Sequence, residues 1–305
     1  MATVPTRYRL GILGAALLFS TGGAAIKLCS LDGWQVASFR SGLAALTLAV
    51  LCPRALRGWS WRTLVVGCAH GATMLLFALG NKLTTAANAI FLQSTAPLYI
   101  LVLAPFLLRE RARRSDLGLM AAIAVGLALF FIELDPTTAS APEPFLGNVL
   151  GAASGVTWAL TLLGLRWLAH TRTDHTTTGA DHSVAAVIVG NGLACLVALP
   201  AALPLAGGTG TDWLTLGYLG VVQIALAYLL LTYGLRRVPA FEGSLLILIE
   251  PTLNPLWAWL LQGEVPGAWA LVGGAIILGS TIVKSWTERR RSEPPDGPFT
   301  SRAPP

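Results

Sequence analysis

Residues 87–111 read ANAIFLQSTAPLYILVLAPFLLRER, an apolar stretch that two prolines interrupt and that ends on an Arg-Glu-Arg cluster. A helix of about 20 apolar residues crosses the hydrocarbon core of a bilayer, which is roughly 30 Å thick. Proline cannot donate the helical N–H bond, and its ring clashes with the preceding turn. The stretch therefore predicts a membrane-spanning helix with a bend at Pro97.

A second stretch, residues 241–265, repeats this pattern as FEGSLLILIEPTLNPLWAWLLQGEV. Pro97 matches Pro251 and Glu110 matches Glu264, and each pair lies 154 positions apart (251 − 97). We therefore expect both helices to bend at the same depth. Broken membrane helices at corresponding places in two halves of a chain are typical of transporters.

The composition indicates an integral membrane protein. The 305 residues are 54% hydrophobic and 12% charged, whereas soluble domains carry about 25% charged residues. The mean hydropathy is +0.65. A net charge of +6 could suggest nucleic-acid binding, but the basic residues lie in short loops between apolar runs, which argues against it. The four cysteines form no CxxC pair, so we expect neither a zinc site nor a disulfide framework.

Ten apolar segments predict an all-α protein with ten transmembrane helices. The first resembles a signal peptide but is interpreted as an uncleaved span. The segments are 9–28, 34–52, 63–80, 84–108, 116–134, 145–168, 184–204, 213–235, 239–261 and 266–286.

The distribution of basic residues predicts the orientation. If the N-terminus is cytoplasmic, 18 of the 21 Lys and Arg residues lie in cytoplasmic segments and only Lys82 lies in an outer loop. Lys27 and Arg40 fall within spans. This asymmetry favours an even number of spans with both termini in the cytoplasm.

Each half then holds five spans, an odd number, so the second half must enter the membrane inverted. We expect one repeat in residues 1–137, a second in 138–287 and a disordered cytoplasmic tail in 288–305. Gly147, Gly151 and Gly155 predict a close-packing face on the sixth span. The polar loop from His170 to His182 holds three histidines, but its spacing fits no standard metal site.

Three stretches together resemble the EamA domain of the drug/metabolite transporter superfamily: SFRSGLAALTL at 38–48, STAPLYILVLAPFLLRERARRSDLGLMAAIAVGLAL at 94–129, and EPTLNPLWAWLLQGEVPGAWALVGGAIILG at 250–279. Each domain of that family has Pro in its fourth helix, Glu at the end of that helix and a Gly-rich fifth helix. The two Pro and Glu pairs take these places, and Arg40 takes that of the second-helix arginine. The resemblance implies ten helices, a cavity between the repeats, and export or exchange of small metabolites. It does not name the substrate.

Ionisable groups inside spans are costly, so each needs an explanation. Arg40 could bind a substrate carboxylate or phosphate, or it could hold helices together through backbone carbonyls. Asn254 lies one turn beyond Glu250, and both are candidates for contacting the substrate. Glu250 lies midway along the ninth span, directly before Pro251. It is the candidate for carrying a proton across the membrane. Alternatively, Arg40 or Lys27 pairs with it, or it lies near water.

Further polar and aromatic side chains are candidates for contacting the substrate. His70, Gln93 and Gln223 could bind a ligand or form hydrogen bonds between helices. Trp158 and Tyr228 could line a cavity for flat substrates. Lys27, near the outer end of the first span, is expected to extend its ammonium group into the interface.

Together these features predict a secondary transporter of the inner cell membrane that exports small organic metabolites, amino acids or drug-like compounds by alternating access. A facilitator that exchanges a metabolite without protons is the closest alternative. A membrane-embedded enzyme is disfavoured, because no HExxH or phosphate-binding loop is present. The expected partners are a small-molecule substrate and the lipid bilayer, without cofactor or metal, in a monomer or a homodimer.

Overall fold

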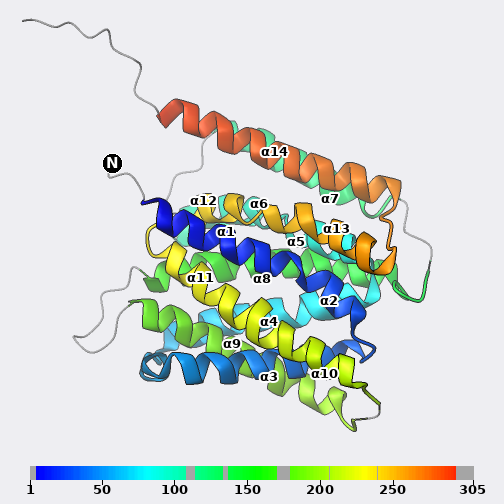
Figure 1. Ribbon diagram of the computed structural model, residues 1–305. Helices are drawn as coiled ribbons and strands as arrows, with labels where there is room; N and C mark the ends of the chain where they lie inside the picture. Colours follow the sequence, from blue (N-terminus) through cyan, green and yellow to red (C-terminus); the bar gives the residue numbers. More distant parts are fainter. Residues whose placement is uncertain are drawn as a thin grey trace, which may run out of the picture.

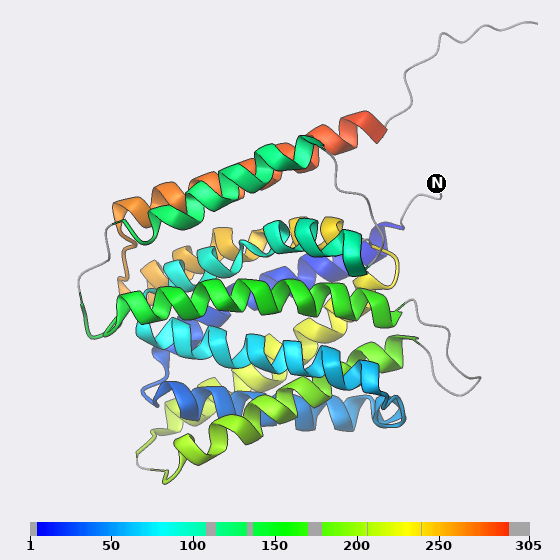
Figure 2. The ribbon, with the colours of Figure 1, turned by 180° about the vertical axis from the view of Figure 1, so that it is seen from behind.

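The computed structural model describes residues 5–107, 114–132, 137–169, 179–205, 207–238 and 240–292. All regular structure in these ranges is helical, and the helices form one bundle (Figures 1 and 2). The helices are α1 (Thr6–Ser20), α2 (Gly22–Leu28), α3 (Gly33–Leu51), α4 (Trp61–Leu83), α5 (Ala86–Gln93), α6 (Ala96–Leu107), α7 (Arg114–Leu129), α8 (Pro144–Ala169), α9 (Gly179–Ala202), α10 (Gly210–Gly217), α11 (Ala227–Leu235), α12 (Ala240–Leu246), α13 (Ile249–Gln262) and α14 (Ala268–Ser292).

Eight helical stretches in the described ranges are long and apolar enough to cross a membrane, which makes this a multi-pass membrane protein. They comprise α1 with α2, α3, α4, α5 with α6, α8, α9, α10 with α11, and α12 with α13. Two further expected spans correspond to α7 and α14. Their apolar parts, Leu117–Leu129 and Ala268–Ser280, are shorter.

The fourth and ninth expected spans are each interrupted before the matched proline. The fourth breaks between α5 and α6, just before Pro97, and the ninth breaks between α12 and α13, just before Pro251. In each case the missing N–H and the ring disturb the preceding turn. The second proline of the fourth stretch, Pro105, lies inside α6 and does not end it.

Two irregularities were not expected from the sequence. The first span divides at Thr21 into α1 and α2. In the eighth span, the residues Tyr218–Leu226 between α10 and α11 form a π-helical segment. Such segments are rare and often occur at functional sites. Both irregularities lie beside the central cavity described below.

Helix α4 lies at the centre and packs against α8 and α9, while α7 and α14 run side by side at one edge (Figures 1 and 2). Glycines allow the closest approaches. A Cβ on Gly147 would lie 2.5 Å from the Thr84 nitrogen, and one on Gly155 would lie 2.9 Å from the Leu92 carbonyl oxygen. The predicted close-packing face on α8 is thus confirmed.

Polar side chains define several helix ends. Asp32 accepts hydrogen bonds from the backbone of Trp34 and Gln35 at the start of α3, and Ser60 caps α4 in the same way. Helix α13 ends at Gly263, whose φ of 65° suits glycine. The last helix continues to Ser292, beyond residue 288, where we expected the tail to begin.

Some expected features lie outside the described residues. They are Glu110 in 108–113, the His-rich loop over 170–178, and the tail from 293 onward.

Candidate functional site

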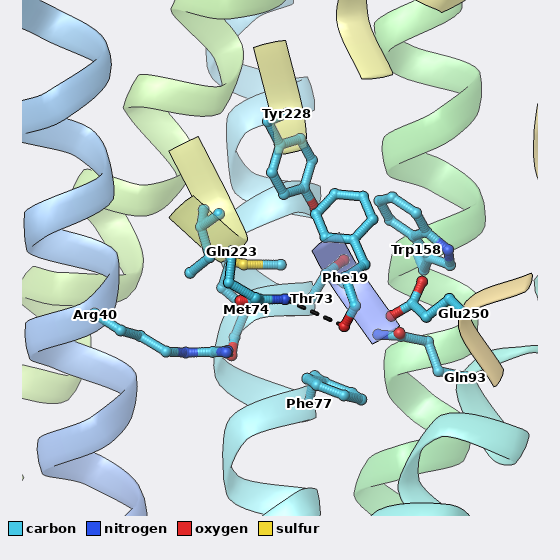
Figure 3. Close-up of a pocket in the computed structure, with 11 residues that line it drawn as sticks. Phe19, Arg40, Thr73, Met74, Phe77, Gln93, Trp158, Gln223, Tyr228 and Glu250 are labelled. Atoms are coloured by element: carbon cyan, nitrogen blue, oxygen red, sulfur yellow. Dashed lines mark hydrogen bonds between the residues drawn. The ribbon is translucent and has the colours of Figure 1, made fainter. Parts of the chain in front are cut away.

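A cavity of about 30 Å³ lies in the middle of the bundle, where side chains from both halves of the chain converge (Figure 3). A buried water needs roughly 10 to 15 Å³ of such space, so the cavity has room for only a few water molecules. Its lining residues are Phe19, Arg40, Thr73, Met74, Phe77, Gln93, Trp158, Gln223, Ile224, Tyr228 and Glu250. Six of the eight expected substrate contacts are among them: Arg40, Gln93, Trp158, Gln223, Tyr228 and Glu250.

Arg40 extends from α3 toward the cavity (Figure 3). Its side chain is fully buried, and Nη2 donates a hydrogen bond of 2.9 Å to the Met74 carbonyl of α4. This bond supports the helix-linking role. Its Nε has no hydrogen-bond partner among the described residues, so the guanidinium retains a donor for a ligand.

Glu250 lies in the first turn of α13, immediately after the helix break. The side chain is buried, and neither a hydrogen bond nor an ion pair joins its carboxyl group to another described residue. The expected alternative of pairing with Arg40 or Lys27 is therefore not observed. The two ion pairs within the described ranges are Arg9–Glu242 and Lys27–Glu264.

The two glutamines bring amide groups to the cavity from irregular backbone. Gln93 is the last residue of α5, at the break that precedes Pro97. Gln223 lies in the π-helical segment, and its Nε2 donates a long hydrogen bond of 3.5 Å to the Phe19 carbonyl. The Oε1 of Gln223 has no hydrogen-bond partner in the described part of the chain. Amide groups of this kind can both donate to and accept from a polar ligand.

Three aromatic rings pack against one another beside these polar groups. The ring centroids of Phe19 and Tyr228 lie 5.0 Å apart, and Trp158 lies 6.2 Å from each. All three pairs are edge-to-face, the arrangement that aromatic quadrupoles favour. The cavity therefore has one predominantly aromatic wall.

His70 and Asn254 do not line the cavity, contrary to expectation. A hydrogen bond of 2.8 Å joins His70 Nε2 to the Asn191 side chain on α9, and the His70 ring packs against Tyr228 at 4.5 Å. His70 thus links helices behind the cavity wall. Asn254 faces the backbone of Gly23 instead, where a Cβ would lie 2.4 Å from its Oδ1.

A second cavity of about 20 Å³ lies where the two proline breaks meet. Pro97 and Pro251 both line it. Gln93, Trp158 and Glu250 line this cavity as well as the central one. Movement at either break would therefore change the surroundings of Glu250.

The expected position of Lys27 in the interface is wrong. Its side chain is only 5% exposed, and Nζ donates a 2.6 Å hydrogen bond to the Thr84 carbonyl and another to the Ser140 carbonyl. Nζ also lies 3.6 Å from Glu264 Oε1. Glu264 in turn accepts a 2.9 Å bond from the Ala86 backbone at the start of α5.

Five lining residues were missed by sequence reasoning, namely Phe19, Thr73, Met74, Phe77 and Ile224. Met74, Phe77 and Ile224 are apolar and have no pattern that separates them from lipid-facing residues. Phe19 had one available signal, since it lies just before the Gly22-Gly23 pair. Among the described residues, no group of three His, Cys, Asp or Glu side chains could hold a metal ion.

The model of the EamA-like transporter family matches residues 7–132 and 145–286. An uncharacterized transporter of Archaeoglobus fulgidus is 28% identical over 71% of this chain and 77% of its own. The pseudopaline exporter CntI of Pseudomonas aeruginosa is 26% identical over 90% of this chain and 94% of its own.

The threonine/homoserine exporter RhtA of Salmonella typhimurium is 26% identical over 75% of this chain and 72% of its own. One solved crystal structure superposes with a TM-score of 0.65, covering 94% of this chain and 99% of the other, at 21% identity. At that identity the likeness concerns the fold alone.

Proposed function

The chain belongs to the EamA-like transporter family, and from this premise we propose that it exports a small organic metabolite by alternating access. Two of its relatives are named as exporters, one of pseudopaline and one of threonine and homoserine. Threonine and homoserine are amino acids, which are small and polar. The class of substrate that we propose for this chain is accordingly a small polar metabolite, including amino acids.

The observation that carries this proposal is the central cavity, which is lined by a cation and an acid that form no ion pair with any described residue. Arg40 comes from the first half of the chain and Glu250 from the second. Buried ionisable groups in membrane spans are expensive, face the bundle interior and mark substrate or ion pathways. We assign substrate binding to the six expected residues that line the cavity, and proton coupling to Glu250.

The architecture that we propose is ten spans in two inverted five-span repeats, residues 1–137 and 138–287. The helix contacts support it. The main contacts between a helix of the first half and one of the second have counterparts in which the equivalent helices of the two halves have changed places. Helix α4 packs against α8 as α11 packs against α1, and α5 packs against α8 as α13 packs against α1. The packing of α3 on α9 and of α7 on α14 joins equivalent spans.

Alternating access requires contacts that open at each end in turn. One ion pair lies toward each end of the bundle: Arg9 with Glu242, 2.7 Å apart, and Lys27 with Glu264. The cavity between them is too small for a metabolite, so the helices must move apart to admit one. We propose that the breaks at Pro97 and Pro251 serve as the hinges.

We place the protein in the cytoplasmic membrane with both termini in the cytoplasm, on the basis of its loop charges. A facilitator without proton coupling remains the alternative mechanism. The two differ in one respect, because only the coupled transporter is driven by an imposed pH gradient.

Counterflow in proteoliposomes tests the function. Vesicles preloaded with a mixture of unlabelled amino acids and small metabolites should accumulate one of their labelled forms. Arg40→Ala and Glu250→Gln should abolish this uptake. Trp259→Leu, at an exposed position on α13, is the matched control and should transport normally. A folded wild-type protein that moves no solute from this panel would overturn the proposal.

A further inference from the structure

The two charged groups of the cavity have complementary ligand requirements. Arg40 has an unpartnered Nε, and the carboxyl group of Glu250 has no hydrogen bond or ion pair among the described residues. Both side chains are more than nine-tenths buried. In Figure 3 the guanidinium and the carboxyl group lie on different sides of the cavity. A ligand with a carboxylate at one end and a cation at the other would neutralise both.

The aromatic box, defined as Phe19, Trp158 and Tyr228, adjoins the acidic side of the cavity. The Glu250 carboxyl group lies beside Trp158 (Figure 3). The rings of the box cross at 65° to 87°, so their faces point in different directions around one region. A cation over an aromatic face is attracted by the ring quadrupole, and several such faces together recognise alkylated ammonium groups.

We infer, on the basis of the proposed function, that the substrate is a zwitterion whose carboxylate pairs with Arg40 and whose N-alkylated ammonium group enters the aromatic box beside Glu250. A primary ammonium group has three N–H donors that need acceptors. A trimethylammonium group has none. Its charge is stabilised by the carboxylate and the ring faces, and its methyl groups pack against the aromatic wall.

The aromatic box must open to admit this group, because its rings contact one another around a cavity of about 30 Å³. Two of its members lie next to irregular backbone. Phe19 is two residues before the division at Thr21, and Tyr228 follows the π-helical segment closely. Ligand contacts would replace the ring-to-ring contacts as these segments shift.

Binding to the full-length protein in lipid nanodiscs tests the inference by calorimetry. The probes are glycine betaine, its uncharged-head isostere 3,3-dimethylbutanoate, and glycine. Betaine should bind at least tenfold more tightly than either, a difference of about 1.4 kcal/mol. Trp158→Leu and Phe19→Leu should remove this preference. Arg40→Ala should weaken the binding of betaine and the binding of dimethylbutanoate by the same factor. Trp259→Leu should change nothing, and melting temperatures will show that each variant is folded.

Three results would overturn the inference: no betaine binding, equal binding of betaine and its isostere, or glycine binding as tightly as betaine. Counterflow with the mixed metabolite panel separates this failure from failure of the proposed function. If the wild type moves any other solute and Arg40→Ala does not, the transporter stands and the ammonium subsite fails. If it moves none, the proposed function itself fails.

Discussion

Lys27 Nζ lies 3.6 Å from Glu264 Oε1, and each side chain is only 5% exposed. The pair ties α2 to the end of α13, and Glu264 also caps α5 through the Ala86 backbone. Removing one member of a buried pair leaves the other charge unpaired, at a cost of about 3 to 5 kcal/mol. Lys27→Met and Glu264→Gln should each destabilise the protein on that scale, measured by unfolding in detergent mixtures.

The double variant Lys27→Met/Glu264→Gln should lose less stability than the two single changes added together. The exposed pair provides the control. Arg9 and Glu242 are 39% and 27% exposed, so neutralising them should cost at most about 1 kcal/mol. Strictly additive effects at Lys27 and Glu264 would show that the pair is not coupled.

Gly22 leaves room for an amide from the other half of the chain. A Cβ there would lie 2.5 Å from Gln223 Nε2. Gly22→Ala should therefore displace Gln223 and cost roughly 1 to 3 kcal/mol, as overpacking does elsewhere. The measurement is the unfolding free energy together with counterflow.

Shortening the displaced side chain should relieve the clash, so Gly22→Ala/Gln223→Ala should recover most of the lost stability. Gly192 is the matched control, since nothing lies within 4 Å of the position where its Cβ would be. Gly192→Ala should be neutral or stabilising, because alanine favours helix by about 1 kcal/mol. Equal losses in both single variants would contradict this account.

Pro97 and Pro251 should control the rate of transport more than the binding of substrate. Alanine restores the missing N–H donor and lets the broken helix straighten. We expect Pro97→Ala and Pro251→Ala to lower turnover by about tenfold, equivalent to 1.4 kcal/mol on the barrier. Binding should stay close to wild type, as calorimetry and initial transport rates together can show.

Pro200, an exposed proline within α9, supplies the control because no helix break follows from it. Pro200→Ala should leave turnover unchanged. If all three proline variants transport alike, the breaks are structural and not hinges.

Glu250→Gln should also fail in a second assay, which measures the response of net transport to a pH gradient. In vesicles with an imposed pH gradient and no internal solute, net transport should be lost, because glutamine cannot carry a proton. Glu242→Gln, at a partly exposed acid paired with Arg9, should retain the response. Net transport by Glu250→Gln that still follows the pH gradient would exclude Glu250 as the coupling residue.

Much of the fold could be predicted from the sequence, because spans are set by a requirement of length and polarity that each segment meets alone. The breaks before Pro97 and Pro251 were predicted from the missing donor, but Pro105 and Pro200 lie inside α6 and α9 without ending them, so a proline alone does not determine a break. The division at Thr21 and the π-helical segment could not be predicted. Gly22 and Gln223 bring these two irregular segments against each other, although they are 201 positions apart in the chain (223 − 22).

The candidate site divides in the same manner. Charged and amide residues could be recognised one by one, because each is polar within an otherwise apolar span. Six of the eight expected contacts line the cavity. The apolar lining could not be recognised, because a helix inside a membrane bundle can be apolar on every face. Its sequence therefore does not reveal which face meets the protein and which meets lipid.

The sequence by itself determined that the chain crosses the membrane many times and that two related halves carry matched prolines. It also identified Arg40 and Glu250 as ionisable residues inside membrane spans, where burial is costly. Only the tertiary structure decided the partners: Asn191 for His70, Glu264 for Lys27, and none among the described residues for Glu250. The physical reason is that hydropathy specifies how deep a residue lies, whereas the rotation and tilt of each helix are set by packing against its neighbours.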